Sequence, residues 1–180
     1  SGGYNDQTGT ILNPLPAAAI RPVDPEFVDS YEAGVKGSFA DGRATLSATV
    51  FQADYKDAQR TFNASFPGGQ ETLFFNAADL TSKGIELEGT FAPTENFVLR
   101  AMAAFTDAKY DRFEADTNFD GINDIDLSGR PVTRVPEVQY GYDATYTMPV
   151  GDWGELKLNG RITHESESVA GYSDVGTAFD

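Results

Sequence analysis

The feature that most constrains this chain is an alternation of apolar and polar residues in six separate segments. In residues 138–148 every second residue is Val, Tyr, Ala or Met, and those between them are Gln, Gly, Asp or Thr. Successive side chains of a β-strand point to opposite faces, so this period of two predicts strands with one apolar and one hydrated face. The pattern recurs in residues 31–39, 44–55, 85–91, 97–105 and 156–163, although Phe51 interrupts it on the polar face of the second.

The connections between these strands are short and long in turn. Asp41-Gly42 predicts a tight hairpin turn, and residues 93–96 and 150–154 are also short connections. Longer polar stretches lie at roughly residues 60–72, at 111–133 and after 165. This order predicts an antiparallel up-and-down meander with all its long loops at one edge, as in bacterial outer-membrane barrels.

Composition and charge exclude several classes of protein. Thirteen Phe, eight Tyr and eighteen Gly favour strands and turns over helices, and no apolar stretch approaches the ~18 residues of a membrane-spanning helix. The formal net charge of −15 argues against binding of nucleic acid. Because the chain contains no Cys, a disulfide framework, a thiolate zinc site and a cysteine nucleophile are excluded. Its first residues show no signal-peptide pattern.

The two faces of the predicted strands differ in chemistry. The hydrated face carries charged residues such as Glu32, Lys36, Arg100, Asp143 and Arg161. The other face is small or apolar, with aromatic residues near strand ends, as is typical of a lipid-facing surface. In a soluble protein a second layer would have to cover that face, and the sequence predicts neither a helix nor a second sheet. The fold is therefore predicted to be all-β, with about six long strands of a membrane barrel.

Four blocks of the sequence resemble TonB-dependent outer-membrane receptors. They extend over residues 25–149 in the order and at the spacing of that family. The blocks are PEFVDSYEAGVK at Pro25–Lys36, GRATLSATVFQADYKD at Gly42–Asp57, NAA at Asn76–Ala78 followed by SKGIELE at Ser82–Glu88, and LSGRP at Leu127–Pro131 followed by VP at Val135–Pro136.

This resemblance implies that the six strands are a partial section of a 22-stranded transmembrane β-barrel, whose lumen a separate N-terminal plug domain closes. The family imports scarce nutrients, such as ferric siderophores, cobalamin or oligosaccharides, across the outer membrane of Gram-negative bacteria. The implied partners are TonB, which acts through the plug region, the outer-membrane lipid and the small-molecule nutrient. Since the sequence contains no plug, no TonB box and no terminal aromatic strand, we expect a fragment without transport activity of its own.

The expected organisation has three parts. Residues 1–27 are predicted to be an external loop segment, and residues 28–167 the six-stranded section of the receptor barrel. Residues 168–180 are predicted to begin the next external loop, at which the chain is truncated.

One motif points to metal binding. Asp116, Asn118, Asp120 and Asp124 occupy the oxygen-ligand positions of a D-x-N-x-D-G-x-x-D calcium loop, whose Gly permits a sharp turn. The position of the bidentate Glu of an EF-hand is Leu127, so the match is incomplete. Two interpretations stay open: these four residues bind Ca²⁺ and order the loop, or they form a solvated acidic turn. No other cofactor is predicted.

The remaining candidates do not form a catalytic site. His164 is the single histidine, so neither a histidine metal cluster nor a Ser-His-Asp arrangement can be argued from it. Glu86 and Glu88 share one strand face, and alternation of lumen-facing charges explains them better than glycosidase chemistry does. Among the aromatic residues, Tyr110, Phe113 and Phe119 are predicted to contact a ligand, and Trp153 to anchor a turn at the membrane interface.

The sequence therefore predicts a part of an importer, which contributes barrel wall and external loops, and not an enzyme. The alternative is a soluble antiparallel β-protein with a calcium-stabilised binding or adhesive role. The two differ in one observable property. The apolar face of the sheet stays exposed in the first and is covered in the second.

Overall fold

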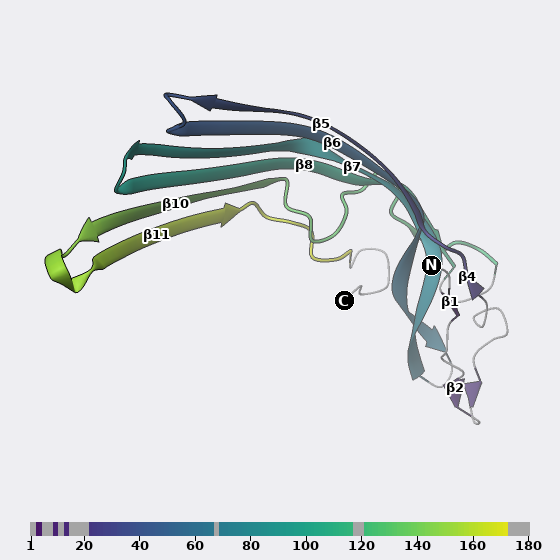
Figure 1. Ribbon diagram of the computed structural model, residues 1–180. Coiled ribbons are helices and arrows are strands. Elements are labelled where there is room, and N and C mark those ends of the chain that lie inside the picture. The colour runs from purple at the N-terminus through teal and green to yellow at the C-terminus, as the bar shows by residue number, and fades with distance from the viewer. Residues whose placement is uncertain are drawn as a thin grey trace.

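A computed structural model describes residues 3–4, 9–10, 13–14, 22–66, 69–116 and 121–172, with side chains for residues 22–61, 75–116 and 121–172. Its main element is a curved antiparallel sheet (Figure 1). The long strands are β5 (Phe27–Phe39), β6 (Ala44–Phe66), β7 (Gly69–Thr94), β8 (Phe97–Ala115), β10 (Val138–Pro149) and β11 (Glu155–Glu165). Short strands are β1 (Gly3–Tyr4), β2 (Gly9–Thr10), β3 (Asn13–Pro14), β4 (Pro22–Val23) and β9 (Ile125–Asp126).

Each long strand pairs with its neighbours in the chain, in the order β11-β10-β8-β7-β6-β5. The predicted all-β meander of six long strands is thus confirmed. The sheet is open, with β5 and β11 at its edges. None of the helical segments in the described part of the chain is long and apolar enough to span a membrane.

Three short turns lie together at one end of the sheet, at the left in Figure 1. The turn after β5 is closed by hydrogen bonds from the Gly42 N–H to the Phe39 carbonyl and from the Arg43 N–H to the Ala40 carbonyl, both 3.1 Å. The backbone has positive φ at Ala40, Asp41 and Gly42. Between β10 and β11 the chain makes one turn of 3₁₀ helix, η2 (Gly151–Trp153), with Trp153 almost fully exposed. The predicted segregation of short turns is confirmed.

The prediction of a long polar loop at about residues 60–72 is wrong, because β6 and β7 continue through it. They stay paired from Arg60↔Phe75 to Phe66↔Gly69. Between Tyr55 and Ala58, where Asp57 has φ +54°, β6 has one extra residue, and between Ala58 and Gln59 β7 has one extra residue, so the register beyond both irregularities is unchanged. Each of these β-bulges changes the phase of the alternation within its own strand. The prediction of a loop rested on the polar composition of this stretch, although residues 58–66 alternate between Ala, Arg or Phe and polar residues as a strand does.

The stretch at 111–133 is also more ordered than predicted. Strand β8 continues to Ala115, whereas its pairing with β10 ends at Phe105. Beyond that point the connection that follows β8 returns and pairs with the same edge of β8, through β9. The backbone hydrogen bonds of this return are Asp124 N to Ala115 O (3.0 Å), Leu127 N to Phe113 O (2.9 Å), Gly129 N to Tyr110 O (2.7 Å), Tyr110 N to Arg130 O (3.0 Å) and Val132 N to Ala108 O (2.9 Å).

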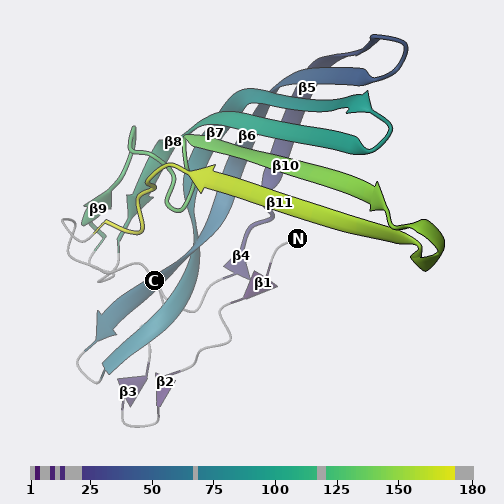
Figure 2. The same ribbon diagram turned by 90° about the vertical axis from the view of Figure 1, so that its left-hand side faces the viewer.

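The connection that contains β9 lies on the concave side of the sheet, at the end opposite the short turns (Figures 1 and 2), and a small hydrophobic core forms there. Here the returning connection packs against the outer ends of β6, β7 and β8. The buried members are Ala58, Ala77, Ala78, Leu80, Tyr110, Phe113, Ala115, Ile125, Leu127 and Tyr172. Most of the sheet lies outside this core. The core therefore stabilises only the end opposite the short turns, and the rest of both sheet faces is not covered by it.

Candidate membrane-facing band and lumen-facing surface

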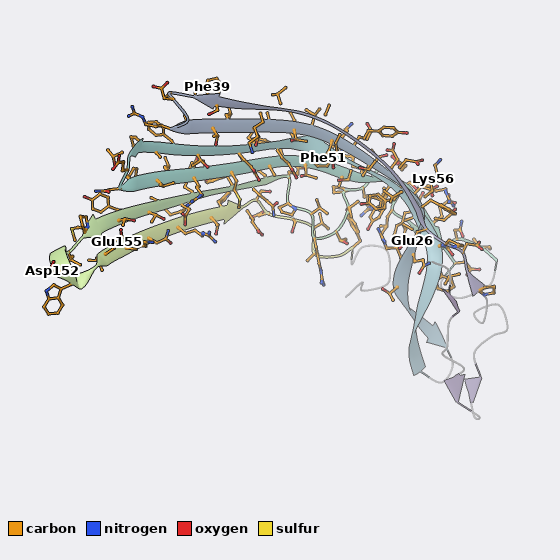
Figure 3. All side chains as sticks on the ribbon, in the orientation of Figure 1. Glu26, Phe39, Phe51, Lys56, Asp152 and Glu155 are labelled. Carbon is orange, nitrogen blue, oxygen red and sulfur yellow. The ribbon has the colours of Figure 1, made fainter. Side chains whose placement is uncertain are left out.

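The convex face of the sheet carries the apolar side chains of all six long strands. On the central strands they include Leu46, Val50, Ile85, Leu87 and Phe105, which are exposed. The prediction that this face stays uncovered is therefore confirmed for the described residues, and the soluble alternative is not favoured. Figure 3 shows side chains projecting from both sides of the single layer of strands.

The convex apolar band has the height of a membrane core. On β10 its side chains run from Val138 to Met148 at every second position. Ten residue steps correspond to roughly 33 Å along a strand, and a strand tilted by about 40° covers about 25 Å of membrane with that length. The band thus matches the apolar height expected of outer-membrane barrels.

The band ends between two adjacent cross-strand rows. The last apolar row joins Val50 to Ala33 and Ile85 and continues to Phe105 and Val138. The next row away from the short turns joins Tyr31, Gln52, Lys83 and Asp107. Because apolar side chains give way to polar ones at one level on several strands, the convex face has a defined upper boundary.

Ion pairs and hydrogen bonds join the polar side chains above this boundary. Asp107 pairs with Lys109 at 2.9 Å and with Lys83 at 3.9 Å. The Thr81 hydroxyl lies 3.0 Å from Asp54 Oδ1 and 2.7 Å from Asp111 Oδ2. In a membrane-spanning wall, groups at this level would contact water or lipid head groups, where charged side chains are tolerated.

A second network holds the β-bulge above the apolar band. Asp79 accepts hydrogen bonds from the Asp57 N–H at 3.0 Å and from Arg112 Nε at 2.9 Å. Partial burial raises the pKa of Asp79, but these two hydrogen bonds and the positive charge of Arg112 outweigh it and hold the pKa below its usual value. The ionised carboxylate therefore stabilises the fold above the ordinary pKa of Asp, and this contribution is lost as the pH falls through the lowered value.

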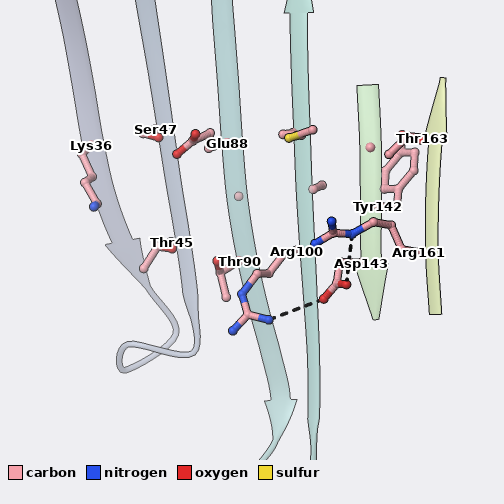
Figure 4. A pocket seen from close by; sticks show the side chains of 14 residues that line it. Lys36, Thr45, Ser47, Glu88, Thr90, Arg100, Tyr142, Asp143, Arg161 and Thr163 are labelled. Carbon is pink, nitrogen blue, oxygen red and sulfur yellow. Dashed lines mark ion pairs between the residues drawn. The ribbon is translucent and has the colours of Figure 1, made fainter. Parts of the chain in front are cut away.

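The concave face carries the charged residues that the sequence assigns to the hydrated side. Arg100 of β8 and Arg161 of β11 flank Asp143 of β10, at 3.6 Å each (Figure 4). The Asp143 side chain is 15% exposed, whereas those of Arg100 and Arg161 are 59% and 71% exposed. Asn159 Nδ2 donates to Asp143 Oδ2 at 3.0 Å. The three residues are direct cross-strand neighbours, which is why β-sheet register alone brings them together.

This group lies in a shallow hollow of ≈ 400 Å³ that extends across the concave face. Lys36, Glu88 and Thr163 also line it (Figure 4). Glu86 and Glu88 lie on the concave side of β7, as predicted for lumen-facing residues, and no catalytic partner is placed beside them among the described residues. The alternation in the sequence predicts that Arg100, Asp143 and Arg161 share one face, but only the strand register brings the three together.

The residues predicted to contact a ligand are not on the surface. Tyr110 and Phe113 lie in β8 and are 3% and 2% exposed, with ring centroids 4.7 Å apart. They pack beneath the returning connection, so the prediction that they contact a ligand is wrong; Phe119 lies outside the described residues. Two arginines cover rings of this core: Arg60 lies 5.9 Å from the Tyr110 centroid and Arg130 lies 5.0 Å from that of Tyr172.

The structure does not test the predicted calcium loop as a whole, because Asn118 and Asp120 lie outside the described residues. Asp116 Oδ2 accepts a hydrogen bond from the Gly121 N–H at 2.8 Å. The Asp124 N–H bonds the Ala115 carbonyl, so Asp116 and Asp124 both lie at the base of the connection. In residues 22–61, 75–116 and 121–172 no three His, Cys, Asp or Glu side chains are grouped to hold a metal ion. The calcium site stays a prediction.

His164 lies on the convex face of the edge strand β11, where its ring packs 4.8 Å from that of Tyr140. His164 is exposed and lies near the upper end of the apolar band. Tyr140 and Tyr31 supply aromatic rings at the same end of the band, as expected at a membrane interface.

Comparisons with known proteins agree with this architecture. The family model described as TonB dependent receptor-like, beta-barrel matches residues 1–179. The ferric-pyoverdine 358 receptor of Pseudomonas putida is 25% identical over 154 residues, which are 85% of this chain and 17% of that protein. The chain thus spans about a sixth of the length of this relative.

Two solved structures resemble the chain. The ferric yersiniabactin uptake receptor FyuA of Yersinia pestis is 18% identical, with a TM-score of 0.61 over 90% of this chain and 21% of that one. The alcaligin outer-membrane receptor FauA of Bordetella pertussis is 23% identical, with a TM-score of 0.49 over 80% of this chain and 23% of that one. The first similarity supports the fold, and the family match extends over nearly the whole chain. The chain belongs to the TonB-dependent receptor family and forms part of its β-barrel domain.

Proposed function

We propose that this chain is a section of the wall of a TonB-dependent importer in the outer membrane of a Gram-negative bacterium. The observation that supports this most strongly is the change from the apolar row of Val50 and Ile85 to the polar row of Gln52 and Lys83. A soluble sheet has no reason to change chemistry at one level across several strands, whereas a membrane wall must do so at the lipid interface.

In this proposal residues 28–167 form the wall, and residues 1–27 and 168–180 belong to external loops. Strands β5 and β11 pair with further strands of the receptor, because an unpaired edge is not tolerated within lipid. TonB supplies energy to the whole receptor, and the chain carries no catalytic activity.

We further propose that the transported nutrient is a ferric siderophore. The Pseudomonas putida relative is named for ferric pyoverdine, and the structurally similar FyuA for uptake of ferric yersiniabactin. The packed rim around Leu127 would then help to shape the outer mouth of the receptor, since it holds the returning connection on the concave side.

The experiment uses the intact receptor in iron-starved cells. Uptake of radiolabelled ferric pyoverdine, ferric yersiniabactin, cobalamin and a maltodextrin is compared with and without TonB. We expect the receptor in the outer-membrane fraction and TonB-dependent uptake of a ferric siderophore. Uptake of cobalamin or maltodextrin alone would contradict the substrate class, and absence from the outer membrane would contradict the whole proposal.

A further inference from the structure

The segment that precedes β5, residues 22–26, is held by one side chain of β7. This segment, the strap, contains β4 and leads into β5. Asn76 Oδ1 accepts a hydrogen bond from the Asp24 N–H at 2.7 Å, and Asn76 Nδ2 donates to the Asp24 carbonyl at 2.9 Å. Asn76 therefore bonds both backbone groups of Asp24, as a residue of a neighbouring strand would.

The same amide joins the strap to the irregular part of the sheet. Asn76 Nδ2 also donates to the Asp57 carbonyl at 2.6 Å. Gln59 lies directly opposite Asn76, and its Nε2 donates to the Asp24 carbonyl at 3.0 Å. The Gln59 backbone N–H donates to Glu26 Oε2 at 3.0 Å. Since an Asn side chain offers one carbonyl oxygen and two N–H donors, the polar groups of Asn76 all have partners in this arrangement.

These bonds place the strap on the convex side of the outer strand ends. Phe75 packs against the small hydrophobic core, which lies on the concave side. Asn76 is the next residue along β7 and therefore points to the opposite side. Val23 of the strap is 8% exposed although it is not a member of that core. Because Val23 pairs with Gly3, the strap also positions the short strand β1.

Two other external connections lie on the concave side. The connection after β8 packs into the core with Leu127. The segment after β11 enters the same core with Tyr172, whose O–H donates to the Pro131 carbonyl at 2.6 Å. In a closed barrel the concave side at this end borders the mouth. These two connections are thus directed toward the mouth, whereas Asn76 directs the strap away from it.

We propose that Asn76 is a positioning residue that holds the strap on the lipid-facing side of the receptor rim and so keeps it clear of the mouth. The proposal rests on the proposed function, because only a closed transport barrel has a mouth. Without the hydrogen bonds of Asn76, the strap loses its attachment to β7 and can fold toward the concave side. A released strap then competes with the incoming nutrient for the space above the lumen.

The first part of the test locates the strap in the full-length receptor. A photo-reactive benzophenone amino acid is placed at Pro22, which lines a hollow of ≈ 270 Å³ together with Glu114 and Asn123. We expect a cross-link within the polypeptide, to a peptide that contains Glu114 or Asn123. In Asn76→Asp the new carboxylate has no N–H for the carbonyls of Asp24 and Asp57, so the yield should fall by roughly tenfold. Asn76→Leu, which has neither donor nor acceptor, should lower it as well.

The second part measures access to the mouth, through uptake of radiolabelled ferric pyoverdine by the same receptors without the benzophenone. In both Asn76 variants the half-saturating concentration should rise by roughly fivefold or more, because only receptors with a clear mouth bind the nutrient. The maximal rate should not change. A merely structural role would instead lower the maximal rate, since fewer receptors would be folded.

The matched control is Asn96→Asp, the same chemical change at an exposed residue in the short turn between β7 and β8. It should leave the cross-link and the half-saturating concentration unchanged. Heat-modified electrophoretic mobility checks that each variant is a folded barrel. A parent receptor without the cross-link overturns the proposal, as does a folded Asn76→Asp variant that keeps it. Loss of the cross-link with an unchanged or lower half-saturating concentration overturns it too.

The two proposals fail separately. Cross-linking needs no nutrient, so a parent receptor that does not take up ferric pyoverdine counts against the proposed substrate, while the cross-link yields still decide on Asn76. A parent receptor that takes up ferric pyoverdine but lacks the cross-link leaves the proposed function in place and overturns the placement of the strap.

Discussion

Gly84 lies where a strand backbone and an aromatic ring leave no room for a side chain. A Cβ atom built at this position would overlap the Phe105 carbonyl oxygen of β8 and lie 2.8 Å from Cζ of Phe51. Phe51 interrupts the alternation of β6 because its ring lies over this glycine on the concave face. The SKGIELE block therefore contains glycine for a packing reason, which the sequence pattern alone did not reveal.

Gly84→Ala is predicted to destabilise the barrel by about 1–3 kcal/mol, because the added methyl group must displace the Phe51 ring and the β8 backbone. The matched control is Gly89→Ala on the same strand, whose Cβ would have ordinary contacts at 3.6 and 3.8 Å. Urea denaturation of the intact receptor in detergent measures both. Equal urea midpoints for the two variants would show that residue 84 can accommodate a methyl group, which would contradict the close contacts at Gly84.

The acidic motif makes a prediction for single residues as well. If Asp116, Asn118, Asp120 and Asp124 converge on Ca²⁺, calorimetric titration of the intact receptor gives a binding heat that Asp120→Ala abolishes. Asp41→Ala, in the turn at the opposite end of the sheet, should leave that heat unchanged. No heat in the parent receptor would identify the motif as a solvated turn.

The six strands could be predicted from the sequence because their alternation is local and reports directly on two faces. The outer parts of β6, β7 and β8 could not. Residues 58–66 alternate, but the polar composition of the stretch around them is also typical of a loop, and Tyr110 and Phe113 of β8 face a core that the sheet does not contain by itself. That core forms only when the segment containing Leu127 returns to β8, a contact between residues that no short-range pattern encodes.

This returning segment should behave as one cooperative unit. Leu127→Ala removes a side chain that is 2% exposed and should cost about 2–5 kcal/mol of local stability. Amide hydrogen exchange at Leu127, Gly129 and Val132 is then expected to accelerate by roughly tenfold or more, since these N–H groups bond the β8 edge.

The control for this element is Leu158→Ala, which shortens an exposed side chain on the convex face of β11. Exchange in residues 124–132 should not change in that variant. Mass spectrometry of the intact receptor resolves both regions. Unchanged exchange in Leu127→Ala would mean that the hydrogen bonds to β8 hold the segment without the core.

For the whole molecule, depth in the membrane decides which substitutions are tolerated. The convex face of β6 contains Leu46 within the apolar band and Gln52 in the first polar row above it. Ala48 and Val50 lie between them on the same face. The sequence predicted that this face is apolar, but the level at which it ends depends on how the strands are staggered. That stagger comes from the register of all the strands together, which neighbouring residues do not determine.

Leu46→Arg is therefore predicted to cost roughly 2–4 kcal/mol of folding free energy in the membrane, and Gln52→Arg only about 0–1 kcal/mol. Both substitutions add the same side chain to the same strand and face, at two different depths. Folding of the intact receptor into lipid vesicles, followed by heat-modified mobility over a urea series, measures the difference. Equal costs would place the two residues at equal depth and contradict the boundary between the apolar row and the polar row. The expected order, with Leu46→Arg the more costly, would locate the outer surface of the membrane at Gln52 and Lys83 on the wall of the receptor.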